Sequence, residues 1–258
     1  LRDRVAGTMH VLMFWGFLML ASDMLDLATA NYFSGELLPE LIVGPWNGMV
    51  ELGYTMALIG CVAALVRRVA FTPEKLKGKS QLEGNAILLL IFTITTTSFM
   101  IESKEDPSPF WEPIGHQFSE LGLSDGTVVV SYWLHMLAIS VFLFLIPLSK
   151  HMHLVMAVPN VFFHDTGPAA KMRPLALGDD GKAVPLEDLD IDSFGVSSYS
   201  QYTWRQLIDG WSCTSCARCQ DVCPAYASGK GLNPMQVIHD VRDYANEHAP
   251  LLLSGENP

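Results

Sequence analysis

Four long apolar runs in the first part of the chain constrain its fold more than any other feature. They extend from about Val5 to Ala28, Gly48 to Val66, Asn85 to Ile101 and Thr127 to Leu148. Crossing the hydrocarbon core of a bilayer takes roughly 20 residues of helix. Because lipid offers the backbone no hydrogen-bonding partner, each run is expected to be a helix. The sequence therefore predicts a bundle of about four transmembrane helices, the last of which could continue to Val158.

The rest of the chain is polar and predicts a second, smaller part. Half of the 258 residues are hydrophobic, and they are concentrated before residue 160. We expect a transmembrane domain over residues 1–159, an extended linker rich in turn-forming residues over 160–200, and a small α-helical segment over 201–258. Within that segment, a short helix is expected near Tyr202 to Asp209. Asn233 followed by Pro234 predicts the start of another helix, so the whole chain is expected to be all-α.

The distribution of charge predicts the orientation of the bundle, and the net charge argues against some classes of partner. The net charge of −11 argues against nucleic acid or anionic lipid as the main partner. Basic residues flank three membrane ends, namely Arg2 and Arg4, then Arg67, Arg68, Lys75, Lys77 and Lys79, then Lys150. The other two connections are acidic. By the positive-inside rule, both ends of the bundle face the cytoplasm, which predicts a multi-pass protein of the cytoplasmic (inner) membrane with its polar segment in the cytoplasm.

Four of the five cysteines form one motif with the spacing of an iron–sulfur site. Cys213, Cys216, Cys219 and Cys223 follow each other in the pattern C-x2-C-x2-C-x3-C, and a proline comes next. Two-residue gaps let thiolates of one tight loop converge on the irons of a cubane, as in bacterial [4Fe–4S] ligation. Zinc sites typically use two separated C-x-x-C pairs, and disulfides are rare in the cytoplasm. We interpret the motif as [4Fe–4S] ligation, with zinc and disulfides as the alternatives.

The motif also predicts that the chain is a piece of a longer polypeptide. In paired-cluster proteins, such a run supplies three ligands to one cluster and its last cysteine to the other. On that logic Cys223 belongs to a second cluster whose other ligands lie downstream. The non-methionine Leu1 and the loop-like final stretch APLLLSGENP point the same way. The alternative is a single cluster closed by all four cysteines.

Three histidines in or next to the apolar runs are candidate haem ligands, because an ionisable residue inside a membrane is costly. His10 lies near the cytoplasmic end of the first run, His135 toward the outer end of the fourth, and His153 at its cytoplasmic end. In one continuous helix, His135 and His153 would be 18 residues apart, which makes five turns and roughly 27 Å, so both would share a face. His10 and His153 would lie at one depth and could bind one haem iron from opposite sides. Alternatively, each histidine pairs with a polar neighbour or a haem propionate.

Other polar residues give weaker signals. Glu51 enters the second run near the outer surface, where it could handle protons for a quinone or only mark the start of the helix. The threonine-rich stretch TITTTS can hydrogen-bond within its own helix or across helices. His239 is interpreted as a surface residue, and Cys61, alone in an apolar run, as a packing residue.

The stretch SYWLHMLAISVFLFLIPLSKHMH resembles the last haem-binding helix of the gamma subunit of respiratory nitrate reductase. There, two histidines at this spacing ligate two b haems. The other haem helix of that subunit carries two histidines ten residues apart, of which the first matches His10 while Leu20 stands at the second position. The resemblance therefore implies one haem b held by His10 and His153. It implies a second haem b only at His135, which lacks its counterpart.

The tail YTWRQLIDGWSCTSCARCQDVCPAYASGKGLNPMQVIHDVRD resembles membrane-bound iron–sulfur oxidoreductases of the heterodisulfide-reductase-like type, and most of all the electron-transfer-flavoprotein:menaquinone oxidoreductases. These join a nitrate-reductase-gamma-like membrane part to two [4Fe–4S] motifs. They normally have a further membrane helix upstream and a second cluster motif downstream, and neither lies within this chain.

This second resemblance implies a quinone-linked oxidoreductase. Electrons would pass between a reduced electron-transfer flavoprotein, the [4Fe–4S] cluster, haem b and menaquinone or another quinone. The alternatives are a membrane subunit of a heterodisulfide- or sulfite-reductase-like complex and a non-catalytic, redox-sensing membrane anchor.

Overall fold

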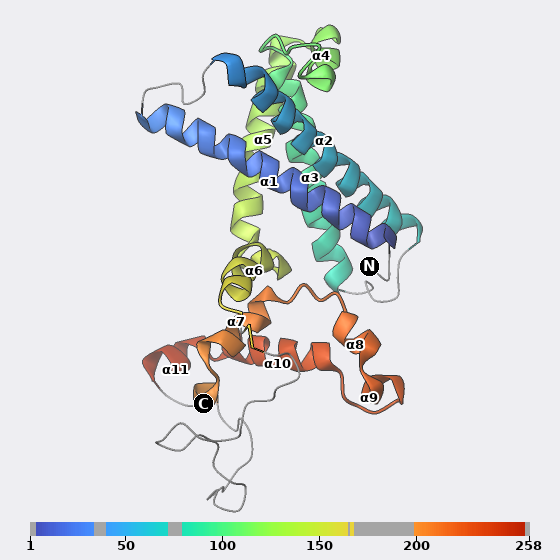
Figure 1. The fold of residues 1–258 in the computed structure, drawn as a ribbon, viewed down its shortest axis with the longest axis vertical. Helices are drawn as coiled ribbons and strands as arrows, with labels where there is room; N and C mark the ends of the chain where they lie inside the picture. The colour runs from blue at the N-terminus through green and yellow to red at the C-terminus, as the bar shows by residue number, and fades with distance from the viewer. Residues whose placement is uncertain (1–3, 34–39, 72–78, 165, 168–198, 256–258) are drawn as a thin grey trace, which may run out of the picture. The chain divides into compact units, whose positions relative to one another are not determined.

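The computed structural model describes the chain except for residues 1–3, 34–39, 72–78, 165, 168–198 and 256–258. Helices are the only regular elements of the described residues, which confirms the all-α fold class (Figure 1). The chain divides into two compact units, Leu1–Leu145 and Ile146–Pro258. Each unit is described by itself below.

The first unit is a bundle of long helices. Its helices are α1 (Arg4–Phe33), α2 (Glu40–Ala70), α3 (Lys79–Glu102), the short α4 (Pro113–Glu120) and α5 (Asp125–Leu145). Within the described residues, α1, α2, α3 and α5 are each long and apolar enough to cross a membrane. The expectation of about four spanning helices is therefore confirmed, and α1, α2 and α3 are longer than the apolar runs that predicted them.

Close backbone contact joins α1 to α2. A Cβ atom on Gly16 of α1 would come within 2.7 Å of the Gly53 carbonyl oxygen and 2.8 Å of the Ala57 nitrogen on α2. Such distances are shorter than real Cβ contacts, so only glycine fits at position 16. Where lipid surrounds the helices, small residues that allow backbones to approach are a main source of helix association.

A small buried core links the first three helices. It contains Met9 of α1, Cys61 and Ala64 of α2 and Leu88 of α3. Cys61 is fully buried, and its Sγ donates to the carbonyl of Leu88 at 2.9 Å. The interpretation of Cys61 as a packing residue is confirmed.

Glu51 attaches the short helix α4 to α2. Glu51 is 5% exposed, and its carboxylate accepts hydrogen bonds from the backbone N–H of Ile114 at 2.9 Å and of Gly115 at 2.8 Å. These N–H groups lie in the first turn of α4, where backbone donors lack a partner within the helix and a negative charge is favoured. Glu51 therefore does more than mark the start of a helix, and its carboxylate is not free. Both of its oxygens cap α4.

The second unit consists of short helices. They are η2 (Lys150–Met152), α6 (His153–Phe162), η4 (Tyr199–Gln201), α7 (Trp204–Ser212), α8 (Arg218–Val222), α9 (Pro224–Ala227), α10 (Pro234–Glu247) and α11 (Ala249–Ser254). Thr203 and Gln206 form a capping box at the start of α7, the helix expected near Tyr202. Asn233 caps α10 as predicted, since its side chain accepts from the backbone N–H groups of Met235 and Gln236.

The structure corrects the expected fourth helix. α5 ends at Leu145 rather than near Leu148 or Val158, and Ile146 begins the second unit. Pro147 lacks the N–H that a continuing helix needs, and its ring crowds the carbonyl four residues before it. Ser149 then caps η2 by accepting from the N–H of His151 at 3.1 Å. His135 and His153 therefore do not lie on one continuous helix, and their inferred common face is wrong.

The domain boundaries differ for the same reason. The compact units divide after Leu145 and not at residue 159, because α6 packs against α7 of the second unit. The first residues of the linker expected over 160–200 belong to α6, which ends at Phe162. Residues 168–198 of that linker lie outside the described residues.

Candidate functional site

The four motif cysteines lie at the ends of short helices and in the loop between them. Cys213 ends α7, Cys216 lies in the following loop, Cys219 is part of α8, and Cys223 stands between α8 and α9. Cys216 and Cys219 are exposed, whereas Cys213 and Cys223 are half-buried. The segment therefore offers four free thiols close together in sequence.

The loop around Cys216 has an uncommon backbone. Ser215 and Ala217, on either side of Cys216, have φ angles of 56° and 59°. The left-handed conformation costs a residue with a side chain roughly 1–2 kcal/mol. Ala217 is buried at 4% exposure and starts α8, where its carbonyl accepts from the N–H of Asp221 at 3.0 Å. The packing thus holds a turn on both sides of Cys216, and turns with left-handed residues are typical of many iron–sulfur sites.

The donor chemistry of this segment fits an iron–sulfur cluster, since thiolates are the ligands of [4Fe–4S] clusters. Among the residues that the structure describes, no group of three or more histidine, cysteine, aspartate or glutamate side chains is gathered closely enough to hold a metal ion. The fit therefore rests on the four thiols and the turn around Cys216. The assignment of Cys223 to the same cluster or to a second one stays a prediction.

Contacts with α6 hold α7, and with it Cys213, in place. Ser212, next to Cys213, donates from Oγ to the carbonyl of Met156 at 3.0 Å. One turn earlier, Asp209 accepts from the Asn160 amide at 2.7 Å and from Arg205 at 2.9 Å. The C-terminal end of α7 is therefore fixed at two successive levels.

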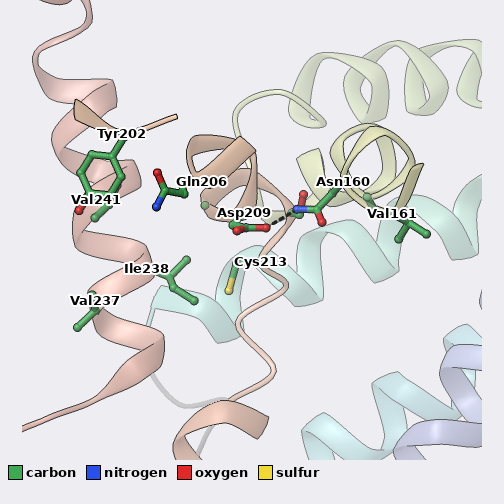
Figure 2. Close-up of a pocket in the computed structure, with 12 residues that line it drawn as sticks. Asn160, Val161, Tyr202, Gln206, Asp209, Cys213, Val237, Ile238 and Val241 are labelled. Carbon is green, nitrogen blue, oxygen red and sulfur yellow. Dashed lines mark hydrogen bonds between the residues drawn. The ribbon is translucent and has the colours of Figure 1, made fainter. Parts of the chain in front are cut away.

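A pocket of about 570 Å³ lies between α6, α7 and α10 (Figure 2). Valine and isoleucine side chains from α6 and α10 line it, and the hydrogen-bonded pair of Asn160 and Asp209 adds polar groups. Cys213 is also part of its lining. The pocket thus places an apolar surface with one polar pair directly beside the first predicted cluster ligand.

His239 of α10 lies next to Cys213, which corrects its interpretation as an ordinary surface residue. Its Nε2 is 3.7 Å from the Cys213 Sγ and 3.0 Å from the Ser215 Oγ. Burial lowers the pKa of His239, and the positive charge of Arg242 lowers it further, against smaller opposing effects of Asp243 and Asp240. No sequence spacing indicates this contact, because it depends on how α10 packs against α7.

The three candidate haem ligands lie in different surroundings. His10 is an exposed residue of α1, His135 is half-buried on α5, and His153 is half-buried at the start of α6. His10 and His135 belong to the first unit and His153 to the second. The shared haem of His10 and His153 therefore stays a prediction.

Two of these rings have Nδ1 engaged with a backbone carbonyl. The Nδ1 of His135 is 3.2 Å from the Ile94 carbonyl and 3.0 Å from the Thr97 hydroxyl on α3. The Nδ1 of His153 is 2.7 Å from the Lys150 carbonyl. A carbonyl can only accept, so where Nδ1 bonds the carbonyl it carries the proton, and Nε2 keeps its lone pair. This is the usual arrangement of a metal-ligating histidine.

Comparisons with curated proteins place most of the chain beside two long relatives. A protein of Syntrophomonas wolfei named "EtfAB:quinone oxidoreductase" is 28% identical over 278 residues, which covers 99% of this chain and 37% of that protein. A protein of Bacillus subtilis named "Probable iron-sulfur-binding oxidoreductase FadF" is 27% identical over 269 residues, which covers 98% of this chain and 36% of that protein. The chain thus spans just over a third of the length of these relatives.

A third relative matches a shorter stretch. It is a protein of Chromohalobacter salexigens named "Probable membrane-anchored ferredoxin", 38% identical over 68 residues, or 25% of this chain and 10% of that protein. No family model matches the chain, and no solved structure matches it significantly. The comparisons confirm the expected resemblance to membrane iron–sulfur oxidoreductases.

Proposed function

We propose that this chain, as a relative of membrane iron–sulfur oxidoreductases, is the membrane part of an enzyme that carries electrons from a reduced electron-transfer flavoprotein to menaquinone or another quinone. One observation carries the proposal. A single chain combines four helices of membrane-spanning length with a C-x2-C-x2-C-x3-C-P segment. The name of the Syntrophomonas relative supports both the flavoprotein donor and the quinone acceptor.

In this proposal Cys213, Cys216, Cys219 and Cys223 provide the thiolates of [4Fe–4S] ligation. Such a cluster supplies one-electron transfer when bound. The protein contributes position and burial, since α6 and α7 hold Cys213 and the left-handed residues keep the turn around Cys216. In the full-length enzyme, we propose that Cys223 serves a second cluster completed by a downstream motif.

His10 and His153 are proposed as the axial ligands of one haem b, with His135 as a ligand of a second. The pairing of His10 and His153 rests on the resemblance to the gamma subunit of respiratory nitrate reductase. The ligand role of His135 and His153 is supported by their engaged Nδ1 atoms, which leave Nε2 available. A haem between the cluster and the quinone would supply a one-electron relay.

The membrane is proposed to be the cytoplasmic (inner) membrane, with the cysteine segment on the cytoplasmic side. The basic connections support this orientation by the positive-inside rule. Cysteines introduced at Lys77 and Ser108 should then differ in accessibility to a membrane-impermeant reagent in right-side-out vesicles. Equal labelling of both would contradict the orientation.

A reduced-minus-oxidised spectrum of membranes that contain the full-length enzyme tests the proposal. We expect b-type haem bands and a low-temperature iron–sulfur signal, both reduced by the reduced flavoprotein and reoxidised by a menaquinone analogue. The His10→Ala variant should lose one low-spin haem and keep the cluster. His164 is not a candidate ligand, so His164→Ala should keep both the haem and the cluster. A cluster that does not respond to the quinone would favour the redox-sensing anchor instead.

A further inference from the structure

The proposed cluster ligand Cys213 has a histidine beside its sulfur, and we infer that His239 tunes the cluster. Its Nε2–H donates a hydrogen bond to the Cys213 sulfur and thereby raises the reduction potential of the cluster that this sulfur ligates. The inference rests on the proposed function, because it requires the cluster. It adds a residue outside the cysteine motif that acts through a ligand and not as one.

The position of His239 is set by the packing of two helices and not by the loop. α10 begins at the Asn233 cap and lies against α7, where Gly210 is buried. A Cβ atom on Gly210 would come within 3.2 Å of the Arg242 Cβ, so the glycine allows α10 to approach the end of α7. His239 lies one turn before Arg242 on α10, and Cys213 directly follows α7. The close contact of α10 with α7 at Gly210 therefore also places the His239 ring beside the Cys213 sulfur.

The atoms around Nε2 fit a shared donor. The Cys213 Sγ at 3.7 Å is within reach of a hydrogen bond to sulfur, and the Ser215 Oγ at 3.0 Å can accept from the same N–H. A cysteine that ligates iron has lost its proton and can only accept. The imidazolium and the neutral Nε2–H tautomer both carry this hydrogen, whereas the neutral Nδ1–H tautomer does not, so the inference requires an Nε2–H and not a charged ring.

The effect on the potential follows from charge. Reduction adds an electron to the cluster and increases the negative charge on its sulfur atoms. A hydrogen bond to a ligating sulfur stabilises that charge more in the reduced state than in the oxidised state. Hydrogen bonds to sulfur are among the factors that set cluster potentials. Removal of the donor should therefore lower the potential.

The test compares two histidine variants of the full-length enzyme by redox titration, followed by low-temperature electron paramagnetic resonance. His239→Phe should shift the midpoint potential of one cluster to a more negative value. His248→Phe is the matched control, because His248 lies just after α10 with its Nδ1 3.0 Å from the Tyr244 carbonyl. It should leave the potential unchanged. An assembled cluster with an unshifted potential in His239→Phe overturns the inference.

A second measurement uses the unaltered enzyme and does not depend on the folding of a variant. With ¹⁵N-labelled histidine, pulsed resonance spectra of the reduced cluster should show a weak nitrogen coupling, of the size that a hydrogen bond transmits. Absence of the coupling overturns the inference, and a strong coupling would identify His239 as an iron ligand instead. If the unaltered enzyme shows no cluster signal at all, the proposed function fails and not only this tuning role.

Discussion

In the membrane-spanning unit, the candidate ligand His135 projects from the middle of a long helix, and α3 supplies both partners of its Nδ1, Thr97 and Ile94. In the second unit, the cysteines lie on helix ends and a loop, and left-handed residues on both sides of Cys216 shape the turn. The contacts of His135 form when α3 packs against α5, without a cofactor. The four thiols lie on a short segment, so we expect the bound cofactor to complete their arrangement.

The difference extends to the nitrogen that each histidine uses. His135 has Nδ1 engaged and keeps Nε2 for a ligand, whereas His239 directs Nε2 toward Cys213 and Ser215. In our proposals, one ring is therefore a metal ligand and the other is the partner of a ligand. The comparison predicts that loss of a cysteine removes a cofactor, whereas changes in the spanning unit act first on packing.

The largest expected effect is that of Cys216→Ser. Loss of a thiolate from the exposed turn should abolish the cluster, because a serine hydroxyl is a poor substitute for a thiolate ligand of iron. Iron and acid-labile sulfide per chain should fall, and the iron–sulfur resonance signal should disappear, while the spanning unit keeps its thermal stability. Cys61→Ser, which retains a donor to the Leu88 carbonyl, is the control and should keep the cluster. An intact cluster in Cys216→Ser would refute the assignment.

Gly16→Leu should have the next largest effect, on the spanning unit alone. Its side chain would collide with backbone atoms of Gly53 and Ala57, and overpacking of this kind costs about 3 kcal/mol. Thermal unfolding in detergent measures the loss. The matched control is Gly126→Leu in α5, where a Cβ meets only the Ser124 Oγ at 3.9 Å. Equal stability of the two variants would show that α1 and α2 do not make this close contact.

Glu51→Ala should destabilise the attachment of α4 by about 2 kcal/mol, because it leaves the buried N–H of Gly115 and the N–H of Ile114 without their acceptor. Glu51→Gln keeps one acceptor and should lose less. The control is Glu120→Ala, at the other end of α4, whose side chain is 70% exposed. Hydrogen exchange of the Ile114 and Gly115 amides reports the change directly. Unchanged protection in Glu51→Ala would exclude the capping role.

The smallest expected effect is that of Thr97→Val, which removes the hydroxyl beside His135 while the Ile94 carbonyl remains. Beyond the hydroxyl's bonds to carbonyls within α3, loss of its bond to His135 is expected to cost about 1 kcal/mol. Thr93→Val is the control, since its hydroxyl bonds only the Leu89 carbonyl within α3. Thermal unfolding and the haem spectrum should both be recorded. An altered spectrum in Thr97→Val but not in Thr93→Val would support His135 as a haem ligand.

Local features of the sequence were enough to predict the spanning helices and the helices that begin near Tyr202 and at Asn233. The number of spanning helices follows from apolar length, because lipid leaves the backbone no alternative to a helix. The start of α10 follows from Asn233 and Pro234, since a cap uses only neighbouring residues. The interpretation of the cysteine motif likewise needs only local sequence, because the spacing of the thiols is itself the signal.

Contacts between helices decided the rest. The end of α5 at Leu145 is an example. Pro147 alone could have produced only a kink in a longer helix, but α6 packs on α7, so the boundary between the units falls after Leu145. The bonds of Glu51 to α4, the Gly16 contact and the place of His239 beside Cys213 each join residues far apart in the chain. Hydrophobic pattern and spacing report which face of a helix is apolar, but not which neighbour it meets. Those partners exist only once the helices have packed.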